Sequence, residues 1–352
     1  MLIIRMIIMK NRKIIRNSSI SVAQHKGYIM NVLVVYNHDS TWVHDDIAIL
    51  QRHYTVDTFF YKKDKKRKNL KELVKKSDVI FIWFASFHGL KAAYLADRFG
   101  KKIVTVASGY SVANLKEFDY GLGVHFYTRW IPKFILKRSD CVIAVSESNK
   151  NEILDLIDHH NNIQVIYHGF DTSQFKPNKD VLKKNMVITV ASLDSVSIKR
   201  KGVDKFVSIA KEFPDCSFIV IGKKGDGSQK LISDATDNVS FPGFVTEEQL
   251  LRFYQQALVY AQFSFHEGFG CTVAEAMLCQ CVPVVTDRGS LPEVVGNKGY
   301  IIPYWNEKKA VESVDSALHL SKDKLKEMRK RIVDEFSMAK REEKIVELME
   351  RL

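Results

Sequence analysis

The sequence predicts an α/β protein made of two similar halves that face each other across a cleft. Short apolar runs alternate with helical patterns along most of its 352 residues, which is typical of a parallel sheet covered by helices on both faces. The alternation runs through the chain twice, and this length is enough for two domains. We therefore expect two Rossmann-like domains, over residues 30–172 and 186–336, joined by a linker at 173–185.

The predicted strands are short apolar runs. Those of the first half are 32–36, 56–60, 79–83, 103–107, 141–145 and 163–167, and those of the second half are 186–191, 218–221, 238–241, 258–263 and 282–285. Helical patterns lie between them, at 45–53, 90–99 and 202–212, and another begins near Val273. Because the strands are short and apolar, we expect helices to cover both faces of each sheet.

Residues 1–29 form a basic extension that precedes the first predicted strand. They hold six Lys and Arg residues and no acid, which is half of the net charge of +12. Their apolar run is too short and too interrupted for a signal peptide. One interpretation is a basic amphipathic segment that lies on a membrane surface, and the other is an upstream start codon with Met30 as the true first residue. We favour the second, because a predicted strand follows Met30 directly.

Composition narrows the class of protein. No uncharged apolar run reaches 18 residues, so we expect no transmembrane helix. The five cysteines are scattered, which favours a reducing compartment, and we expect a cytoplasmic protein. Cys279 and Cys281 have the wrong spacing for zinc, and no Asp-x-Asp or His/Cys cluster suits a metal, so we predict no metal and no cofactor. Basic and aromatic residues are not interleaved, which argues against a nucleic-acid partner.

One stretch of ten residues, 266–275, holds two carboxylates, two glycines and a predicted helix start. The first N–H groups of a helix carry partial positive charge, and glycines let a ligand approach the backbone, so the stretch predicts an anion site. Glu267 lies at the carboxyl end of a predicted strand, where α/β sheets bind ligands, and Glu275 lies about one turn into the helix. Two carboxylates around an anion site suit a nucleotide-linked substrate.

Glu267 and Glu275 are separated by seven residues, and Pro-Val-Val-Thr (283–286), Gly-Ser (289–290) and Pro-Glu-Val-Val (292–295) follow them. Together these residues resemble the Glu-x7-Glu signature and its surroundings in the retaining glycosyltransferases of family 4 (group 1). The likeness extends from about Met30 to the end of the chain.

This resemblance implies the GT-B fold, in which two Rossmann-like domains face each other and the last helix, here 337–352, crosses back to the first domain. It implies a retaining, metal-independent transfer of a sugar from a nucleotide-diphospho-sugar, held by the second domain, to an acceptor. The acceptor would be a glycan or a lipid, and the nucleotide sugar would be a co-substrate rather than a cofactor.

The resemblance also assigns roles to individual residues. Glu275 would hold the ribose, and Glu267 would contact the transferred sugar near its reacting face. Lys201 matches the family's lysine before a glycine and would neutralise the leaving diphosphate. The backbone that would bind the diphosphate beside it consists of Gly268, Phe269, Gly270, Cys271 and Thr272.

A second loop completes the predicted donor site. Backbone groups of Phe244 and Val245 would bind the edge of the nucleobase. The family usually has an arginine where Ser192 stands at the end of the second domain's first strand, and Arg200 or Lys199 would compensate for it.

Ser108 of the first domain is a further departure, because many members have a histidine there that contacts the donor sugar. His125 is close in sequence, but nothing places it at the cleft. The departures at Ser108 and Ser192 leave open a non-catalytic subunit that binds a nucleotide sugar. A sugar epimerase or phosphorylase of the same architecture is a third interpretation.

A basic run at 62–68, continuing to Lys75 and Lys76, holds nine basic residues against two acids. With Trp130 and Phe134 it would allow peripheral contact with an anionic membrane, at the inner face if the protein is cytoplasmic. A solvated charged loop and helix face explains the same residues about equally well.

Overall fold

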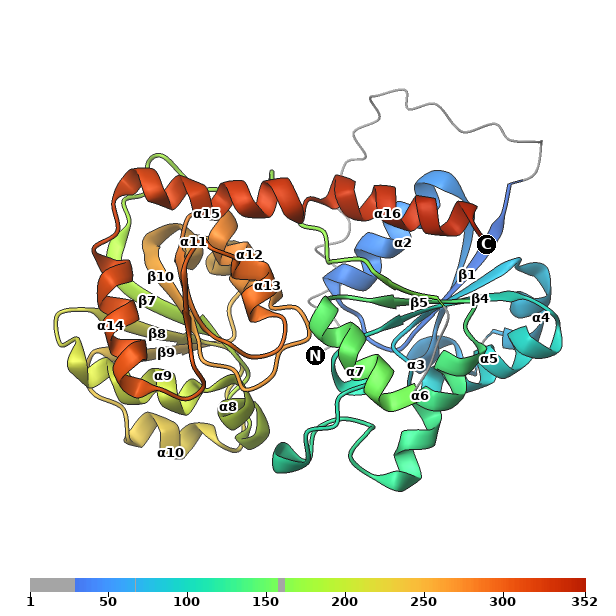
Figure 1. Ribbon diagram of the computed structural model, residues 1–352, viewed down its shortest axis with the longest axis horizontal. Coiled ribbons are helices and arrows are strands. Elements are labelled where there is room, and N and C mark those ends of the chain that lie inside the picture. The colour runs from blue at the N-terminus through green and yellow to red at the C-terminus, as the bar shows by residue number, and fades with distance from the viewer. Residues whose placement is uncertain (1–28, 67, 158–161) are drawn as a thin grey trace.

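The structure, a computed structural model, describes residues 29–66, 68–157 and 162–352. Two six-stranded parallel sheets with flanking helices lie beside each other (Figure 1). This confirms the predicted α/β class with two Rossmann-like halves. The question of a start at Met30 or upstream concerns residues 1–28, which lie outside the described residues.

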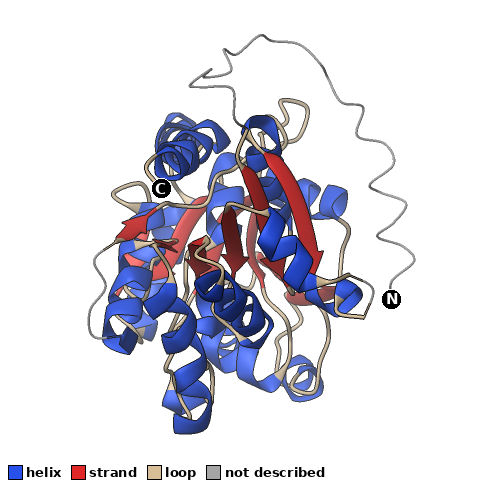
Figure 2. Cartoon of the chain, turned by 90° about the vertical axis from the view of Figure 1, so that its right-hand side faces the viewer, coloured by secondary structure: helices blue, strands red, loops and turns tan. Residues whose placement is uncertain are grey.

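The first sheet has the strand order β2-β1-β3-β4-β5-β6. Its strands are β1 (Asn31–Tyr36), β2 (Thr55–Phe60), β3 (Val79–Trp83), β4 (Lys102–Ala107), β5 (Cys141–Ala144) and β6 (Ile163–Val165). Its helices are α2 (Thr41–His53), α3 (Tyr61–Asp64), α4 (Leu70–Lys76), α5 (Phe87–Arg98), α6 (Phe126–Arg138) and α7 (Glu147–Ile157). The long loop between β4 and α6 contains two 3-10 turns, η2 (Gly109–Ser111) and η3 (Lys116–Phe118). Figure 2 views this domain from outside, with helices on both sides of its strands.

The second sheet has the strand order β12-β11-β10-β7-β8-β9. Its strands are β7 (Lys184–Val190), β8 (Ser217–Ile221), β9 (Val239–Gly243), β10 (Ala257–Gln262), β11 (Val282–Thr286) and β12 (Tyr300–Ile302). Its helices are α8 (Ser195–Lys201), α9 (Val203–Ile209), α10 (Ser228–Ser233), α11 (Glu247–Gln256), α12 (Cys271–Leu278), α13 (Leu291–Val295), α14 (Glu307–Leu318) and α15 (Lys322–Glu335), with the 3-10 turn η4 (Ala210–Glu212) after α9.

The central strands are buried on both faces, as the continuous apolar runs predict. All residues of β3, β5, β10 and β11 are buried. Parallel strands reach this state because the crossover helices pack on both sides of the sheet. The eleven predicted strands all occur, with ends that differ by at most two residues from the predictions.

The second domain contains elements that were not predicted. The edge strand β12 was not predicted, because it is only three residues long. Helix α8, in the segment that precedes Gly202, was not among the predicted helices. Asp194 begins this helix by accepting a hydrogen bond from the Ser197 N–H (2.8 Å), a capping contact that only the fold reveals. The helix predicted at 202–212 is α9 followed by η4.

The last helix, α16 (Met338–Glu350), crosses from the second domain to the first (Figure 1). At the crossing point the Phe170 N–H donates to the Phe336 carbonyl (2.9 Å), and the Met338 N–H donates to the Phe170 carbonyl (3.1 Å). Arg341 of α16 then forms a fully buried ion pair with Asp46 of α2 (2.6 Å). The helix predicted to return to the first domain is therefore confirmed.

Candidate functional site

The loops that follow strands of both sheets meet between the two domains. The Ser146 hydroxyl, just after β5, donates to the Gly268 carbonyl after β10 (2.8 Å). A Cβ added to Gly268 would lie 3.4 Å from the Gly109 nitrogen and the Ser108 hydroxyl, which follow β4. The glycine turn between Glu267 and α12 thus faces the first domain, at the carboxyl ends of the strands, where α/β folds bind ligands.

Lys201 and Glu267 form an ion pair at this meeting point. Lys201 Nζ lies 3.3 Å from Glu267 Oε2, and both side chains are mostly buried, with exposed fractions of 19% and 17%. Gly202 makes the contact possible by ending α8 with a positive φ of 66°. A Cβ there would lie 2.1 Å from the Phe263 carbonyl oxygen, so only glycine lets α8 pack this closely against the end of β10.

A second turn holds the backbone of Glu267 from the other side. Both the N–H and the hydroxyl of Ser290 donate to the Glu267 carbonyl, at 3.2 Å and 3.1 Å. Gly289, before it, has a φ of 56°, and a Cβ there would lie 2.4 Å from that carbonyl oxygen. The Gly-Ser pair found in the sequence therefore positions Glu267.

The environment of Glu267 keeps its carboxyl group ionised. Burial raises the pKa of Glu267, but the positive charges of Lys201 and Arg200 lower it by more, and His266 adds to this lowering. The pKa of Glu267 therefore lies below its usual value. A buried carboxylate with this many cationic neighbours is a fixed negative charge at neutral pH.

Neutral polar groups behind Glu267 fix the direction of its carboxylate. Gln262 Nε2 donates to Glu267 Oε2 and to the Ser264 hydroxyl, both at 3.0 Å. The Tyr260 hydroxyl lies 2.7 Å from Thr272 Oγ1 and 3.1 Å from Gln262 Oε1. Buried polar groups that satisfy one another in this way give a rigid site. The network links β10 to the first turn of α12.

Glu275 lies one turn into α12, and its carboxylate accepts a hydrogen bond from the buried Tyr254 hydroxyl (3.0 Å). Burial raises the pKa of Glu275 to about 7, although the hydrogen bond from Tyr254 acts in the opposite direction. The two glutamates of the Glu-x7-Glu signature thus differ in charge state: Glu267 is ionised, whereas Glu275 titrates near neutral pH. Different environments of this kind give two carboxyl groups different roles.

Arg200 points into the space between the domains from α8. Its guanidinium carbon lies 4.4 Å from the ring centroid of Tyr120 in the first domain, and its Nη1 donates to the His266 carbonyl (3.3 Å). The Arg200 side chain is therefore buried between the domains rather than solvated at the surface. Ser192, in contrast, is exposed, and its side chain bonds to Asp194.

Phe244 and Val245 lie apart from this cluster. They follow β9, the edge strand, which β7 and β8 separate from β10. Phe244 is 72% exposed, and both residues line a shallow hollow with Pro242, Arg252 and other residues of α11. The separation of three strand spacings is roughly 14 Å, so only an extended ligand would contact both places.

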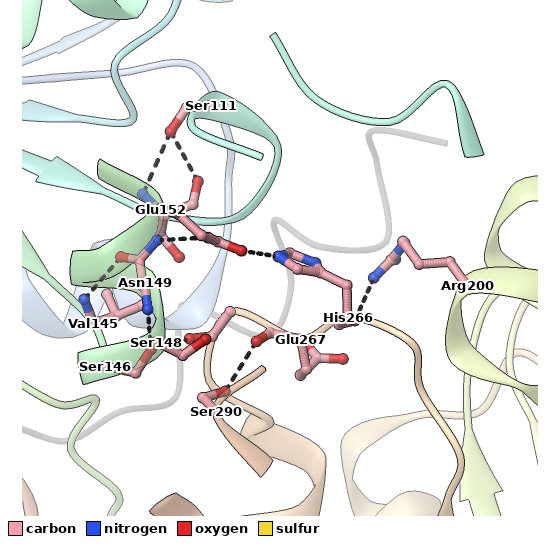
Figure 3. A network of polar contacts seen from close by, with 12 residues as sticks. Ser111, Val145, Ser146, Ser148, Asn149, Glu152, Arg200, His266, Glu267 and Ser290 are labelled. Carbon is pink, nitrogen blue, oxygen red and sulfur yellow. Dashed lines mark hydrogen bonds and ion pairs between the residues drawn. The ribbon is translucent and has the colours of Figure 1, made fainter. Parts of the chain in front are cut away.

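Direct polar contacts hold the two domains together beside the cluster (Figure 3). His266 Nε2 lies 2.5 Å from Glu152 Oε1 of α7. Glu293 of α13 accepts hydrogen bonds from the backbone N–H groups of Glu147 and Ser148, at the start of α7, both at 2.8 Å. The Tyr167 hydroxyl also donates to Glu293 (3.2 Å). The first turn of a helix attracts a carboxylate, so the interaction of Glu293 with the start of α7 stabilises the contact between the two domains.

Sequence reasoning missed several residues of the site. Glu293 belongs to the Pro-Glu-Val-Val sequence at 292–295, but the resemblance gave it no role. Gln262 and Tyr254 lie in or beside predicted elements without a motif, and Tyr120 and Glu152 come from the other domain. Only the fold shows that Gln262 bonds to Glu267 and Tyr254 to Glu275. It also shows that Tyr120, Glu152 and Glu293 make contacts between the domains. His125, which we did not include, bonds to Asp119 (2.8 Å) within its own loop.

Two further features concern ligands and membranes. Among the residues that the structure describes, no group of three or more His, Cys, Asp or Glu side chains is placed to hold a metal ion. No helix within the described ranges is both long and apolar enough to cross a membrane.

Comparison with known families decides the classification of the chain. The model for "Glycosyl transferases group 1" matches residues 169–335, and the model for "Glycosyltransferase Family 4" matches residues 34–174. The two matches together extend over both sheets. The chain belongs to the family 4 (group 1) glycosyltransferases.

This family 4 glycosyltransferase is similar to curated relatives over part of their length. It is 27% identical over 267 residues to N-acetyl-alpha-D-glucosaminyl L-malate synthase of Bacillus anthracis. This alignment covers 70% of this chain and 66% of the relative. It is 30% identical over 149 residues to alpha-galactosylglucosyldiacylglycerol synthase of Streptococcus pneumoniae, covering 40% of this chain and 39% of the relative. The aligned region thus spans less than two thirds of both relatives.

Its fold matches that of solved structures more completely. HepE of Anabaena, solved in complex with UDP and glucose, superposes with a TM-score of 0.72 at 16% identity. The match covers 92% of this glycosyltransferase and 100% of HepE. The predicted GT-B architecture is therefore confirmed.

Proposed function

We propose that this chain is a retaining glycosyltransferase that moves a sugar from a nucleotide-diphospho-sugar to an acceptor without a metal ion. The observation that carries this proposal is the ion pair of Lys201 and Glu267 beside the amino end of α12, between the two domains. An anion site flanked by a fixed carboxylate and a second carboxyl group suits a diphosphate with a sugar at each end. Membership of the family supports it independently.

In this proposal the diphosphate lies at the amino end of α12, where the backbone from Gly268 to Thr272 binds it. Lys201 neutralises the negative charge that develops on the leaving diphosphate, and Arg200 adds a second cation. No metal is needed to neutralise that charge, because two cationic side chains and the amino end of α12 stabilise it. Glu275 binds the ribose, and the loop of Phe244 and Val245 binds the base.

Glu267 contacts the transferred sugar as a fixed negative charge. Retention then proceeds through an oxocarbenium-like transition state, which a nearby carboxylate stabilises because positive charge develops on the sugar ring. The departing phosphate stabilises the same charge from the leaving side. Contacts between the domains, such as His266 with Glu152, exclude water and favour the acceptor over hydrolysis.

The acceptor in this proposal is a glycan or a lipid, bound on the side of the first domain. The name of the Streptococcus pneumoniae relative contains a diacylglycerol, which supports a lipid-type acceptor. The UDP in the HepE complex supports a nucleoside diphosphate as the sugar carrier. A cytoplasmic enzyme with a lipid acceptor would contact the inner face of the membrane peripherally.

Donor turnover tests the function. Purified protein is incubated with UDP-, GDP- and ADP-sugars and with acceptor extracts, in the presence and absence of EDTA, and nucleotide release is measured. We expect release with one donor class, unaffected by EDTA, and the same anomeric configuration in product and donor by NMR. Binding without release across all extracts would instead indicate a non-catalytic subunit, and EDTA sensitivity would contradict the metal-independent mechanism.

A further inference from the structure

We propose that the outer face of α5 and α6 in the first domain docks on an anionic lipid surface. This deepens the proposed function, because it names the surface that would bring a lipid-linked acceptor to the cleft. The proposal depends on exposed aromatic side chains, on the local charge and on the position of α6 next to the cleft.

Helices α4, α5 and α6 form one layer on the first sheet. Their inner sides share a core that includes Val74, Ala92 and Ile135, each fully buried. Residues on the opposite sides of these helices therefore face away from the protein. The layer runs along the lower right of Figure 1, with the start of α6 at the bottom.

Large aromatic side chains stand on that outer face. Phe126, Tyr127 and Trp130, in the first turns of α6, are 89%, 59% and 52% exposed. Phe87 and Tyr94 of the neighbouring α5 are 59% and 49% exposed. Aromatic side chains of this size are normally buried, and a group of five on two adjacent helices marks an interaction surface.

The charge of the same layer is strongly positive. Helices α4, α5 and α6 contain nine basic residues and two acids, and α6 contains no acid. The basic residues are Lys71, Lys75, Lys76, Lys91, Arg98, Arg129, Lys133, Lys137 and Arg138. Both acids are already paired within the layer, Glu72 with Lys75 (3.1 Å) and Asp97 with Arg138 (3.2 Å). The layer therefore presents excess positive charge around the aromatic side chains.

A lipid surface fits this combination better than a protein partner. Lysine is depleted at protein interfaces. Helices that lie in a membrane interface instead combine Trp or Phe, which enter the headgroup region, with Lys and Arg, whose charges meet anionic lipid. Lys133 and Lys137 are spaced three and seven residues after Trp130, on the same side of α6.

The aromatic end of this face lies next to the cleft. The loop from β4 to α6 reaches the second domain, where Phe118 packs on Phe265 with ring centroids 5.0 Å apart and Tyr120 packs on Arg200. Phe126 begins α6 only six residues after Tyr120. A membrane in contact with Phe126 and Trp130 would thus lie beside the mouth of the candidate site, where a lipid headgroup could enter it.

Vesicle flotation tests the docking surface in the full chain, with no nucleotide sugar present. The vesicles contain phosphatidylcholine alone or with phosphatidylglycerol. We expect binding only to the anionic vesicles, and loss of binding at high salt. Phe126→Ser/Trp130→Ser and Lys133→Glu/Lys137→Glu should each weaken binding, the second by at least about 25-fold, because one basic residue contributes about fivefold.

Two control variants change similar residues elsewhere. Leu182→Ser removes an apolar side chain that is 77% exposed in the linker. Lys322→Glu/Lys324→Glu reverses two exposed charges on α15 of the second domain. Both controls should bind vesicles as the wild type does. Residues 1–29 are also basic, and equal binding by the α6 variants would assign the docking to another segment and overturn the proposal.

Tryptophan fluorescence adds a test of orientation. Of the four tryptophans in the chain, Trp130 is placed to enter the headgroup region, whereas Trp83 is fully buried. Brominated anionic lipids should quench the wild type, and Trp130→Phe should bind equally well but lose most of the quenching. Unchanged quenching in Trp130→Phe, or binding of wild type to acidic protein or nucleic acid but not to vesicles, would contradict the proposal. Because flotation and quenching need no turnover, failure of the proposed transfer reaction leaves these outcomes interpretable.

Discussion

Lys201 and Glu267 lie far apart in the sequence but form a mostly buried ion pair, with Nζ 3.3 Å from Oε2. The pair joins the end of α8 to the carboxyl end of β10, and Gly202 allows the close approach. In the proposed function, Lys201 neutralises the leaving phosphate and Glu267 contacts the transferred sugar. Lys201 also lowers the pKa of Glu267, which gives the first prediction.

Replacing Lys201 with methionine should lower turnover and shift its pH dependence. Lys201 lowers the pKa of Glu267 against the effect of burial, so its loss should raise that pKa. Activity that needs the Glu267 carboxylate is lost as the pH falls through its pKa, and the acid limb of the kcat/KM profile should therefore move to higher pH. We expect kcat to fall by roughly 100- to 1,000-fold, as when one preorganised electrostatic group is removed.

Lys199→Met is the matched control, because Lys199 is exposed on the same helix. It should keep both the rate and the pH profile of the wild type. Glu267→Gln should lose turnover with little loss of donor affinity. An acid limb that stays in place in Lys201→Met would show that Glu267 does not govern it.

Glu275 should make donor binding depend on pH near neutrality. Its pKa is raised by burial to about 7, and the ionised form is the better acceptor for ribose hydroxyls. Affinity for the nucleoside diphosphate, measured by calorimetry, should thus decrease as the pH falls through about 7. Glu275→Gln should weaken binding by about 1.5–3 kcal/mol and remove this pH dependence, whereas Glu312→Gln on the exposed face of α14 should change neither.

The same carboxyl group should make the free protein less stable at higher pH. The folded state holds a proton on Glu275 up to about pH 7, whereas a free glutamate loses it near its ordinary pKa of 4.5. The folded state therefore binds more protons between these values, and the free energy of unfolding falls as the pH rises through this window. Above about pH 7, Glu275→Gln should be more stable than the wild type. The full pKa shift would correspond to about 3 kcal/mol, and the gain should be smaller than this because the side chain is partly exposed. Equal urea midpoints at about pH 8 would contradict the raised pKa.

These predictions indicate how far the sequence alone leads. The strands could be predicted, because short apolar runs that are buried on both faces leave a strong signal. The helix start at Cys271 was also predictable, since a glycine turn and a helical pattern bracket it. The capping of α8 by Asp194 and the position of Arg200 inside the cleft were not, because both depend on packing between segments distant in sequence. Tyr120 and Glu152 belong to the other domain and carry no motif.

The contact between Tyr120 and Arg200 should couple the two domains during catalysis. The guanidinium carbon lies 4.4 Å from the ring centroid, and such a contact contributes about 0.5–2 kcal/mol. Tyr120→Leu should lower kcat/KM for the donor by about 2- to 30-fold, whereas Tyr120→Phe should stay near wild type. In a double-mutant cycle with Arg200→Met, the losses should not add, because each change removes the same contact. Fully additive losses would mean that the two residues act independently.

Glu293 should control the closure of the two domains. Its carboxylate in the second domain accepts N–H groups of Glu147 and Ser148 at the start of α7 in the first domain, and the Tyr167 hydroxyl adds a third bond. Hydrogen bonds to a charged group contribute about 1.5–3 kcal/mol each, so Glu293→Ala should shift the equilibrium towards open forms by at least tenfold. Small-angle scattering should then give a larger radius of gyration for the free protein, which a bound nucleoside diphosphate reduces only in part. Glu327→Gln, which alters a carboxylate paired with Lys298 within the second domain (2.9 Å), should keep the wild-type radius. If Glu293→Ala is as compact as this control, the remaining contacts, such as His266 with Glu152, hold the domains together without it.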